Sequence, residues 1–374
     1  MSLLDPWVYP VAVVLAVLSV GGGAVATWRT PRRAWGLAVN ALVIAVASVL
    51  VTLSVALVLN HDNGWYMSWS DVWQDGGAGG VQTTSAGAAS AAQVFQSDPL
   101  GPVTDDRTLP ALPSPGQRIQ VFRVPTSVGT AAWDVTVILP ADYLAAASAH
   151  RAYPVLMAGH GMPGAMQQWS GPIDIRRYAD PLADAHALSP MITVVPALEP
   201  GSRDTECVFG PGGSTQVETW LSRDVPAFVQ AHLRARTGRA AWAWIGISAG
   251  AWCAAMLTMR HPDVFGAAIT LGGYYRPWWA GSPPWPLTSP QEREYDLVAL
   301  AKERPPAVAL WVHSTRQDKG SWPSTQEFLK AVRPPTLVKA TIDPTGGHTW
   351  TSWLPHVTEA LTWLGATVPG FGAG

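Results

Sequence analysis

Charged residues are scarce in this chain, at 13% of its 374 residues, and the two signs nearly cancel to a net charge of -2. Surfaces that bind nucleic acid carry an excess of lysine and arginine, so this composition excludes a broad nucleic-acid interface. Only two cysteines are present, which is too few for a cysteine-based zinc site or a disulfide scaffold. No internal repeat is visible along the chain.

Two long apolar segments lie near the N-terminus, at residues 8–28 and 34–59. Each is long enough to cross the bilayer core, which takes about 20 helical residues. The basic stretch Arg29-Thr30-Pro31-Arg32-Arg33 separates them, and the positive-inside rule places this loop in the cytoplasm and both ends of the hairpin outside. Two such segments in tandem favour a membrane hairpin over buried core helices. The absence of Lys or Arg before the first segment argues against a cleaved signal peptide.

The residues after the hairpin change in character twice. Residues 61–115 begin with aromatic side chains typical of a membrane interface and continue as a Gly-, Ala-, Ser-, Thr- and Pro-rich stretch, which we interpret as a linker. The interfacial aromatics are Trp65, Tyr66, Trp69 and Trp73. From 116 to 366 an opening strand hairpin is followed by alternating strands and helices, and residues 367–374 form a C-terminal tail. This order predicts an α/β domain with a mostly parallel sheet covered by helices on both faces.

The stretch from Trp242 to Cys253 combines a buried strand, a tight turn and the start of a helix. The turn is Gly246-Ile247-Ser248-Ala249-Gly250, a G-x-S-x-G motif. This strand–turn–helix context is that of the nucleophile elbow of α/β-hydrolases, in which the serine is exposed at the top of the sheet. The two glycines leave the positions beside the turn free of side chains. We therefore predict that Ser248 is the nucleophile of a serine hydrolase or acyltransferase.

A serine hydroxyl needs a base that accepts its proton. His348 lies in a loop between the last predicted strand and the last predicted helix, where α/β-hydrolases place their histidine. The other downstream histidines fit less well. His261 follows the nucleophile helix, His313 precedes the predicted acid, and His356 belongs to the last helix.

The base needs a third group that orients it, and two aspartates compete for this role. Asp318 follows the predicted strand 307–313, in a loop at the carboxyl edge of the sheet where functional groups gather. Asp343 follows the next strand. We favour Asp318 as the acid and keep Asp343 as the alternative.

Two backbone N–H groups must stabilise the oxyanion that forms during acyl transfer. One belongs to Ala249, the residue after the nucleophile. The other comes from the loop His160-Gly161-Met162, where we prefer Met162 over Gly161. His160 precedes the serine, so we expect it to contact substrate or to brace this loop.

Four stretches resemble the esterase D and mycobacterial mycolyltransferase (antigen 85-like) branch of the α/β-hydrolase superfamily, over roughly residues 117–364. They are His160-Gly161-Met162, the helix with Glu218-Thr219-Trp220-Leu221 and Asp224-Val225-Pro226, the elbow, and Gly347-His348-Thr349-Trp350-Thr351-Ser352-Trp353. The resemblance implies an α/β-hydrolase fold, a Ser248–Asp318–His348 triad, attack on an ester carbonyl, and no metal or organic cofactor. The chain departs from the mycolyltransferases in having His160 in place of an acidic residue and in having a membrane hairpin.

The two cysteines fall on different elements. Cys207 lies in a polar loop that we expect at the edge of the active site, and Cys253 lies on the helix after Ser248. Two cysteines of an extracytoplasmic domain can pair, so we expect a disulfide. The alternative is a buried apolar Cys253 with a free Cys207.

A Pro- and Trp-rich excursion, Tyr274–Pro290, leaves the carboxyl end of the strand after the elbow. This position should place it over or beside Ser248. We predict that Trp278 and Trp279 line an acyl or sugar cleft, with Trp350 and Trp353 opposite. The alternative is that they pack on the sheet edge or meet the bilayer surface.

Three functions fit these features. The first is a membrane-anchored extracytoplasmic esterase acting on envelope lipids or glycolipids, the second an acyltransferase with a sugar or lipid alcohol as acceptor, and the third a non-catalytic envelope scaffold. Intact serine, aspartate and histidine in the expected order favour an enzyme. Expected partners are a lipid or glycolipid ester and the bilayer, with no nucleic acid. The acyl chain, the acceptor and the oligomeric state stay open.

Overall fold

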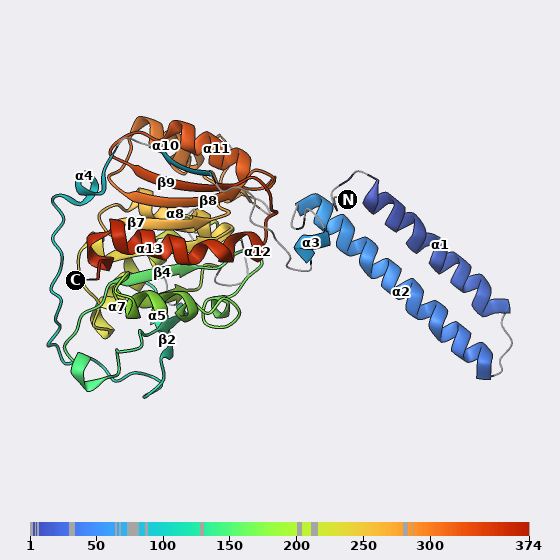
Figure 1. Ribbon diagram of the computed structural model, residues 1–374, viewed down its shortest axis with the longest axis horizontal. Coiled ribbons are helices and arrows are strands. Elements are labelled where there is room, and N and C mark those ends of the chain that lie inside the picture. Colours follow the sequence, from blue (N-terminus) through green and yellow to red (C-terminus); the bar gives the residue numbers. More distant parts are fainter. Residues whose placement is uncertain are drawn as a thin grey trace.

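The computed structural model consists of an apolar helical hairpin and an α/β domain (Figure 1). It describes residues 3, 5, 7–29, 34–63, 66, 69–72, 82–86, 89–127, 131–199, 204–210, 216–279, 283–286 and 288–373. The predicted turn residues 30–33 and the interfacial Trp65 and Trp73 lie outside this range.

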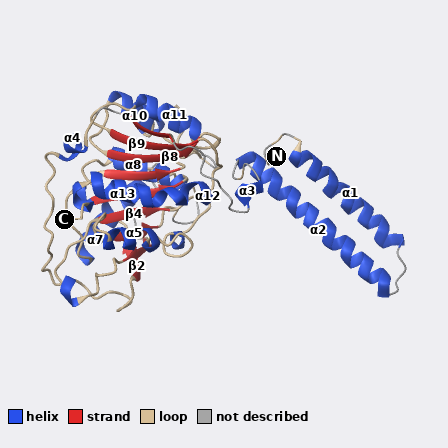
Figure 2. Ribbon diagram, in the orientation of Figure 1, coloured by secondary structure: helices blue, strands red, loops and turns tan. Residues whose placement is uncertain are grey.

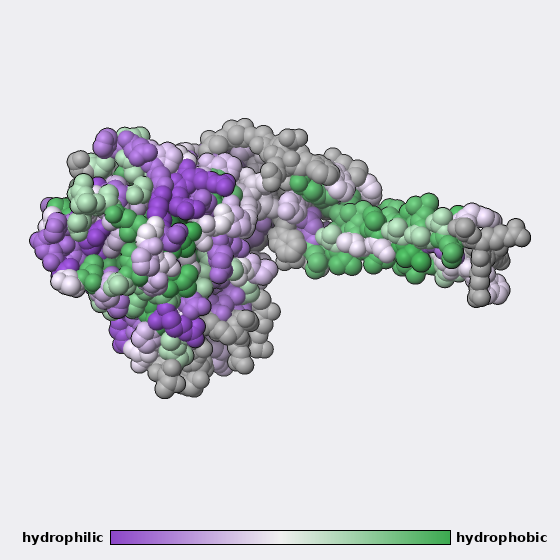
Figure 3. All heavy atoms as spheres, turned by 90° about the horizontal axis from the view of Figure 1, so that it is seen from below, coloured by the Kyte–Doolittle hydropathy of each residue, from purple (hydrophilic) through white to green (hydrophobic). Residues whose placement is uncertain are grey.

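The hairpin consists of α1 (Val8–Arg29) and α2 (Ala34–Asn63), which project from the α/β domain side by side (Figure 1). The two helices contact each other through small side chains: the Ser54 hydroxyl donates to the Ala12 carbonyl at 2.8 Å, and a Cβ on Gly23 would lie 2.9 Å from Val43. Most of their large apolar side chains are exposed, so the hairpin presents a hydrophobic surface (Figure 3). Both helices are long and apolar enough to span a bilayer.

The α/β domain is built on a sheet of nine strands in the order β1-β9-β8-β7-β6-β4-β5-β3-β2. The strands from β9 to β5 run parallel, whereas β1, β3 and β2 each pair antiparallel with their neighbours. In chain order they are β1 (Gln82–Ala86), β2 (Ile119–Pro125), β3 (Ala132–Ile138), β4 (Val155–Gly159), β5 (Ile192–Pro196), β6 (Trp242–Ile247), β7 (Ala267–Leu271), β8 (Ala309–Thr315) and β9 (Leu337–Asp343). Every residue of β4, β5, β6 and β7 is buried, as expected for parallel strands covered on both faces.

Helices cover both faces of this sheet (Figure 2). Buried side chains of α7, α8, α10 and α11 belong to one apolar core, and those of α4, α12 and α13 belong to the other. The helices after the hairpin are α3 (Trp69–Val72), α4 (Ala91–Phe95), α5 (Arg176–Asp184), α6 (Val217–Thr219), α7 (Val225–His232), α8 (Ala249–Arg260), α9 (Pro290–Glu294), α10 (Leu297–Glu303), α11 (Trp322–Ala331), α12 (Trp350–Trp353) and α13 (Val357–Thr367). The predicted sheet with helices on both faces is confirmed.

Part of the predicted linker belongs to the α/β domain. β1 pairs along β9, from Gln82 opposite Ile342 to Ala86 opposite Val338. α4 then places Val94 and Phe95 in the core. The domain therefore begins near residue 82, and the predicted boundary at 116 is wrong. β1 is an exposed edge strand without an apolar face, so its sequence carries no periodic signal.

The predicted C-terminal tail, residues 367–374, is also part of the packed domain. Phe371 is fully buried, and its carbonyl accepts a hydrogen bond from the Ser189 N–H at 2.8 Å. A free tail would leave this aromatic ring in water, so its burial stabilises the end of the domain.

Candidate active site

Ser248 occupies a strained turn between β6 and α8. Its backbone has φ 52° and ψ −121°, a conformation that side-chain-bearing residues rarely adopt and that clusters at functional sites. The turn is possible because Gly246 and Gly250 lack side chains. A Cβ on Gly246 would collide with the backbone of Gly250, and one on Gly250 would collide with the backbone of Gly159. The fold thus holds the serine at the carboxyl end of a central strand.

Ser248, His348 and Asp318 form a continuous chain of hydrogen bonds. The Ser248 hydroxyl donates to His348 Nε2 at 2.7 Å, and His348 Nδ1 donates to Asp318 Oδ2 at 2.7 Å. The His348 and Trp353 rings pack edge to face, with ring centroids 4.7 Å apart. This geometry lets the imidazole accept the hydroxyl proton while the carboxylate fixes its tautomer.

Asp318 is fully buried and ionised within a set of donors. Its Oδ1 accepts from the N–H groups of Gly320 and Ser321, and its Oδ2 accepts from the Ser321 hydroxyl at 2.6 Å. Burial raises the pKa of Asp318, but the hydrogen bond and charge of His348 together with the bonds from Ser321 outweigh it and hold the pKa below its usual value. The carboxylate is therefore available to stabilise an imidazolium.

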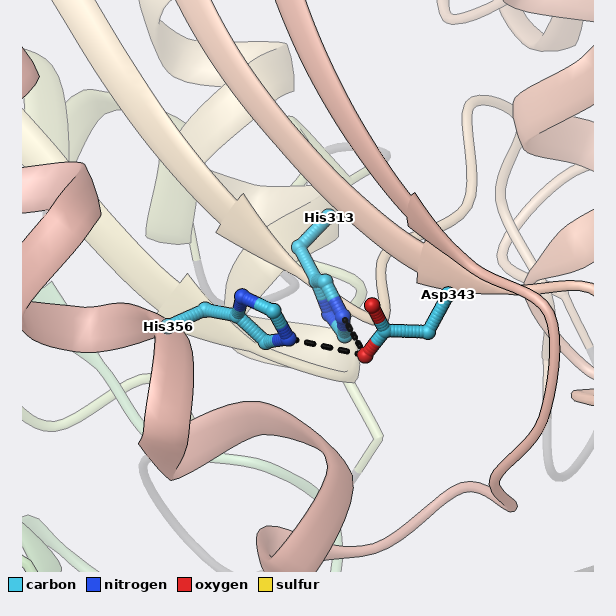
Figure 4. Close-up of side chains that lie close together, drawn as sticks. All are labelled: His313, Asp343 and His356. Atoms are coloured by element: carbon cyan, nitrogen blue, oxygen red, sulfur yellow. Dashed lines mark hydrogen bonds and ion pairs between the residues drawn. The ribbon is translucent and has the colours of Figure 1, made fainter. Parts of the chain in front are cut away.

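Asp343, the rival acid, takes part in a different cluster. Its Oδ2 accepts from His356 at 2.8 Å and from His313 at 3.3 Å (Figure 4). No hydrogen bond joins it to His348 among the residues that the structure describes. The geometry thus joins His348 to Asp318. His313 and His356 take no part in the hydrogen bonds that lead to Ser248.

The loop after β4 lies directly against the nucleophile. A Cβ on Gly161 would lie 3.4 Å from the Ser248 Cβ. Within the described residues, the N–H groups of Met162 and Ala249 have no backbone acceptor. Both are therefore free to donate to an oxyanion formed at Ser248.

His160 braces this loop and does not line the pocket. Its side chain is buried, and Nδ1 donates to the Gly161 carbonyl at 2.9 Å. Burial lowers the pKa of His160, which keeps the ring neutral. Of the two roles expected from the sequence, the structure shows the bracing one.

A pocket of about 380 Å³ opens at Ser248 and His348. Its other lining residues are Tyr66, Gly161, Met162, Pro163, Gln168, Ile247, Thr349, Trp350, Thr351 and Trp353. Trp350 and Trp353 thus both line the pocket at Ser248. Tyr66 and Gln168 were not predicted here, since they come from distant segments that only the tertiary fold brings to the serine.

Trp278 and Trp279 do not line this pocket, so their predicted placement is wrong. Trp279 packs edge-on against Trp285 at 6.0 Å, and Trp285 stacks on Tyr295 at 5.3 Å, within the core. Trp278 is 59% exposed and lies beside Gly320. Trp279 and Trp285 pack onto their own domain, because burying these two rings removes a large apolar area from water.

Comparison with known proteins identifies the family. A family model described as "Putative esterase" matches residues 130–364, more than half of the chain. The chain belongs to the esterase family. This membership favours a serine hydrolase over the predicted alternative of a non-catalytic scaffold.

Solved structures support the same fold for this esterase. A ferulic acid esterase is 21% identical and matches 66% of this chain and 96% of its own, with a TM-score of 0.55. An S-formylglutathione hydrolase from Agrobacterium tumefaciens is 13% identical and matches 67% of this chain and 95% of its own, with a TM-score of 0.53. The predicted α/β-hydrolase fold and the resemblance to esterases are confirmed.

A curated relative matches less of the chain. It is an uncharacterised protein of Corynebacterium glutamicum, 29% identical over 188 residues, which make up 49% of this chain and 42% of that protein. This chain therefore spans less than half of that relative's length.

A disulfide ties helix α8 to the loop before α6. Cys207 and Cys253 are bonded, with a sequence separation of 46 residues. Closing a loop of this length stabilises a fold by about 4 kcal/mol, mainly through the entropy of the unfolded chain. The pairing expected from the sequence is present in the structure.

Glu206, next to this disulfide, is a buried carboxyl group without a cationic partner among the residues that the structure describes. It accepts hydrogen bonds from the Tyr274 hydroxyl at 2.6 Å and the Trp278 N–H at 3.0 Å. Burial raises the pKa of Glu206 to about 8, above the 4.5 expected for an unfolded chain. The unfolded state therefore releases this proton first as the pH rises, and stability falls between those two values.

We expect Glu206→Gln to remove this pH-dependent loss, because an amide carries no proton to release. We would measure the melting temperatures of the full-length variant and the wild type in detergent. The variant's melting temperature minus that of the wild type should be about 5 °C higher at pH 8.5 than at pH 4.5. Glu294→Gln, at a side chain 62% exposed, serves as the control and should show no such trend. If the melting temperatures of Glu206→Gln and the wild type differ by the same amount at both pH values, Glu206 is ionised in the folded protein.

Proposed function

We propose that this protein is a membrane-anchored serine esterase that faces the outside of the cell and cleaves carboxylic esters of envelope lipids or glycolipids. The observation that carries the ester chemistry is the hydrogen-bonded chain from Ser248 through His348 to Asp318, which opens into the pocket. The support for a lipid substrate is the position of this pocket next to the apolar hairpin.

The reaction uses the groups in the order in which they are bonded. Ser248 Oγ attacks the ester carbonyl as its proton passes to His348 Nε2, and Asp318 stabilises the imidazolium. The N–H groups of Ala249 and Met162 donate to the oxyanion. His348 then returns the proton to the leaving alcohol, which departs and leaves an acyl group on Ser248. Water, activated by His348, releases the acid and restores the serine.

The pocket wall includes a residue from the segment that follows the hairpin. Tyr66 lines the pocket, and its N–H and C=O are bonded to the side chain of Asn60 at 2.7 and 2.8 Å. Asn60 belongs to the last turns of α2. If α2 spans the bilayer, this clamp places the mouth of the pocket close to the membrane surface. An ester with its acyl chain in the bilayer could then reach Ser248 over a short distance.

We expect Tyr66→Ala to reduce kcat/KM for a dodecanoyl p-nitrophenyl ester about fivefold to tenfold more than for the acetyl ester. The ring would contact methylene groups that only the long chain possesses, and each buried methylene contributes about 0.8 kcal/mol. Trp278→Ala is the matched control, because it removes an exposed aromatic ring outside the pocket. An equal loss on both esters would show that Tyr66 is structural, and failure of the wild type to cleave any carboxylic ester would refute the esterase.

The same assay separates hydrolysis from acyl transfer. When glycerol or a sugar is added to the assay, an esterase still releases the free acid. An acyltransferase instead forms a new ester with the added alcohol. Dominant formation of the new ester would favour the alternative function that the sequence leaves open.

The orientation in the membrane predicts where reporters work. Alkaline phosphatase, which folds only outside the cytoplasm, should be active when fused after Asn60 and inactive when fused within the 29–33 loop. The disulfide supports this orientation, since such bonds persist in oxidising compartments. Activity of the loop fusion with loss of activity after Asn60 would reverse the topology.

A further inference from the structure

His313, Asp343 and His356 converge on one point near the carboxyl ends of β8 and β9 (Figure 4). The Nε2 atoms of His313 and His356 both face Asp343 Oδ2, at 3.3 and 2.8 Å, and the two rings stack with centroids 4.2 Å apart. The ligand atoms of the three side chains lie within 4.8 Å of one another. None of the three residues lines the Ser248 pocket, so the ester chemistry does not use them.

The two oxygens of the Asp343 carboxylate are unequally satisfied. Within the described part of the chain, Asp343 pairs with no lysine or arginine, only with the two histidines. Its second oxygen, Oδ1, is buried with no partner among these residues. A carboxylate oxygen that is buried without a partner is stabilised by a cation.

We propose that His313, Asp343 and His356 bind a divalent transition metal ion, with Zn²⁺ the best match. Two imidazole nitrogens and one carboxylate oxygen are a common ligand set for zinc, with water in the fourth position. Tetrahedral bonds of about 2.0–2.1 Å place neighbouring ligand atoms about 3.3 Å apart. The His313–Asp343 distance already fits, and the His356–Asp343 distance needs to open by about 0.5 Å.

The surroundings suit a bound ion. The side chains of Asp343 and His356 are 17% and 12% exposed, which leaves an entry path and room for water. His356 Nδ1 faces the Glu359 carboxylate at 3.8 Å. A carboxylate behind a ligating histidine is the usual arrangement for fixing its orientation.

The three ligands also flank the catalytic residues of the proposed triad. Asp343 ends β9, just before the loop with His348, and His356 follows α12, just after it. His313 lies on β8, which leads into the Asp318 loop. A metal at this point would fasten both ends of the segment that holds His348, while touching no reacting atom. Its role is to stabilise the segment, which differs from Lewis-acid catalysis.

The test is calorimetric titration of ZnCl₂ into the chelator-treated, full-length protein in detergent, produced without a polyhistidine tag. The wild type should bind one equivalent, and zinc should raise its melting temperature. His356→Asn should weaken binding at least about 100-fold, since even residues behind the ligands commonly contribute 10- to 100-fold. His150→Asn, at a side chain 72% exposed, should bind like the wild type.

A wild type that binds no zinc, or an affinity that survives His356→Asn, would overturn the proposal. Should His356→Asn fail to fold, X-ray absorption on the zinc-loaded wild type decides the matter. Two imidazole ligands support the site, and one or none excludes it. The titration measures metal binding directly, so its result does not depend on any ester substrate.

Discussion

Ser248→Ala should lower the hydrolysis of p-nitrophenyl acetate by about 10³-fold or more, the loss typical of a triad nucleophile. The same variant should lose all labelling by a fluorophosphonate probe, which reacts with an activated serine. These effects are expected because the Ser248 hydroxyl is the group bonded to His348 Nε2 at 2.7 Å. His348→Ala should cost as much, and the double variant little more, since the two act as a unit.

Ser222→Ala is the control for this experiment. Its hydroxyl is buried and bonded to the Glu218 carbonyl, outside the pocket, so hydrolysis and labelling should persist. Labelling that survives Ser248→Ala would place the nucleophile at another serine and would remove the basis of the proposed mechanism.

Asp318→Asn should cost nearly as much as loss of the serine, about 10³- to 10⁴-fold in kcat. An amide at this position removes the negative charge that stabilises the imidazolium. If its NH₂ group faced His348 Nδ1, two donors would meet and that hydrogen bond would be lost. The Ser321 hydroxyl and the N–H groups of Gly320 and Ser321 should keep the side chain in place, so the variant tests charge more than position.

Asp343→Asn is the informative comparison, because Asp343 is the acid that the sequence could not exclude. We expect it to retain at least about a tenth of wild-type activity, since its carboxylate bonds to His313 and His356 and not to the base. A larger loss for Asp343→Asn than for Asp318→Asn would mean that the acid has been assigned to the wrong residue.

The local parts of this protein could be predicted from its sequence. The elbow around Ser248 was predictable because a strand, two glycines and a helix act over a dozen neighbouring residues. The fully buried central strands were predictable from their continuous apolar runs. His348 and the two candidate acids, Asp318 and Asp343, followed from the chain order of the superfamily and from their place after predicted strands. The apolar hairpin was predictable because its helices need only length and composition.

Contacts between distant segments could not be predicted in the same way. β1 is polar and exposed, and only its hydrogen bonds to β9 make it part of the sheet. Trp278 and Trp279 carry the same apolar signal whether they line a pocket or pack on Trp285 and Gly320, so their burial is decided by the surrounding shape. Backbone pairing and side-chain packing of this kind depend on surfaces that residues close in sequence do not specify.

The sequence by itself determined the hydrolase fold, the tight turn that holds Ser248 and the apolar hairpin, because each depends on residues close together in the chain. The tertiary structure alone decided that Asp318 and not Asp343 meets His348, that Tyr66 reaches the pocket, and that His313 and His356 converge on Asp343. These outcomes depend on distances of a few ångströms between elements that lie far apart along the chain. Such distances are set by how the helices and strands pack, which no local pattern encodes.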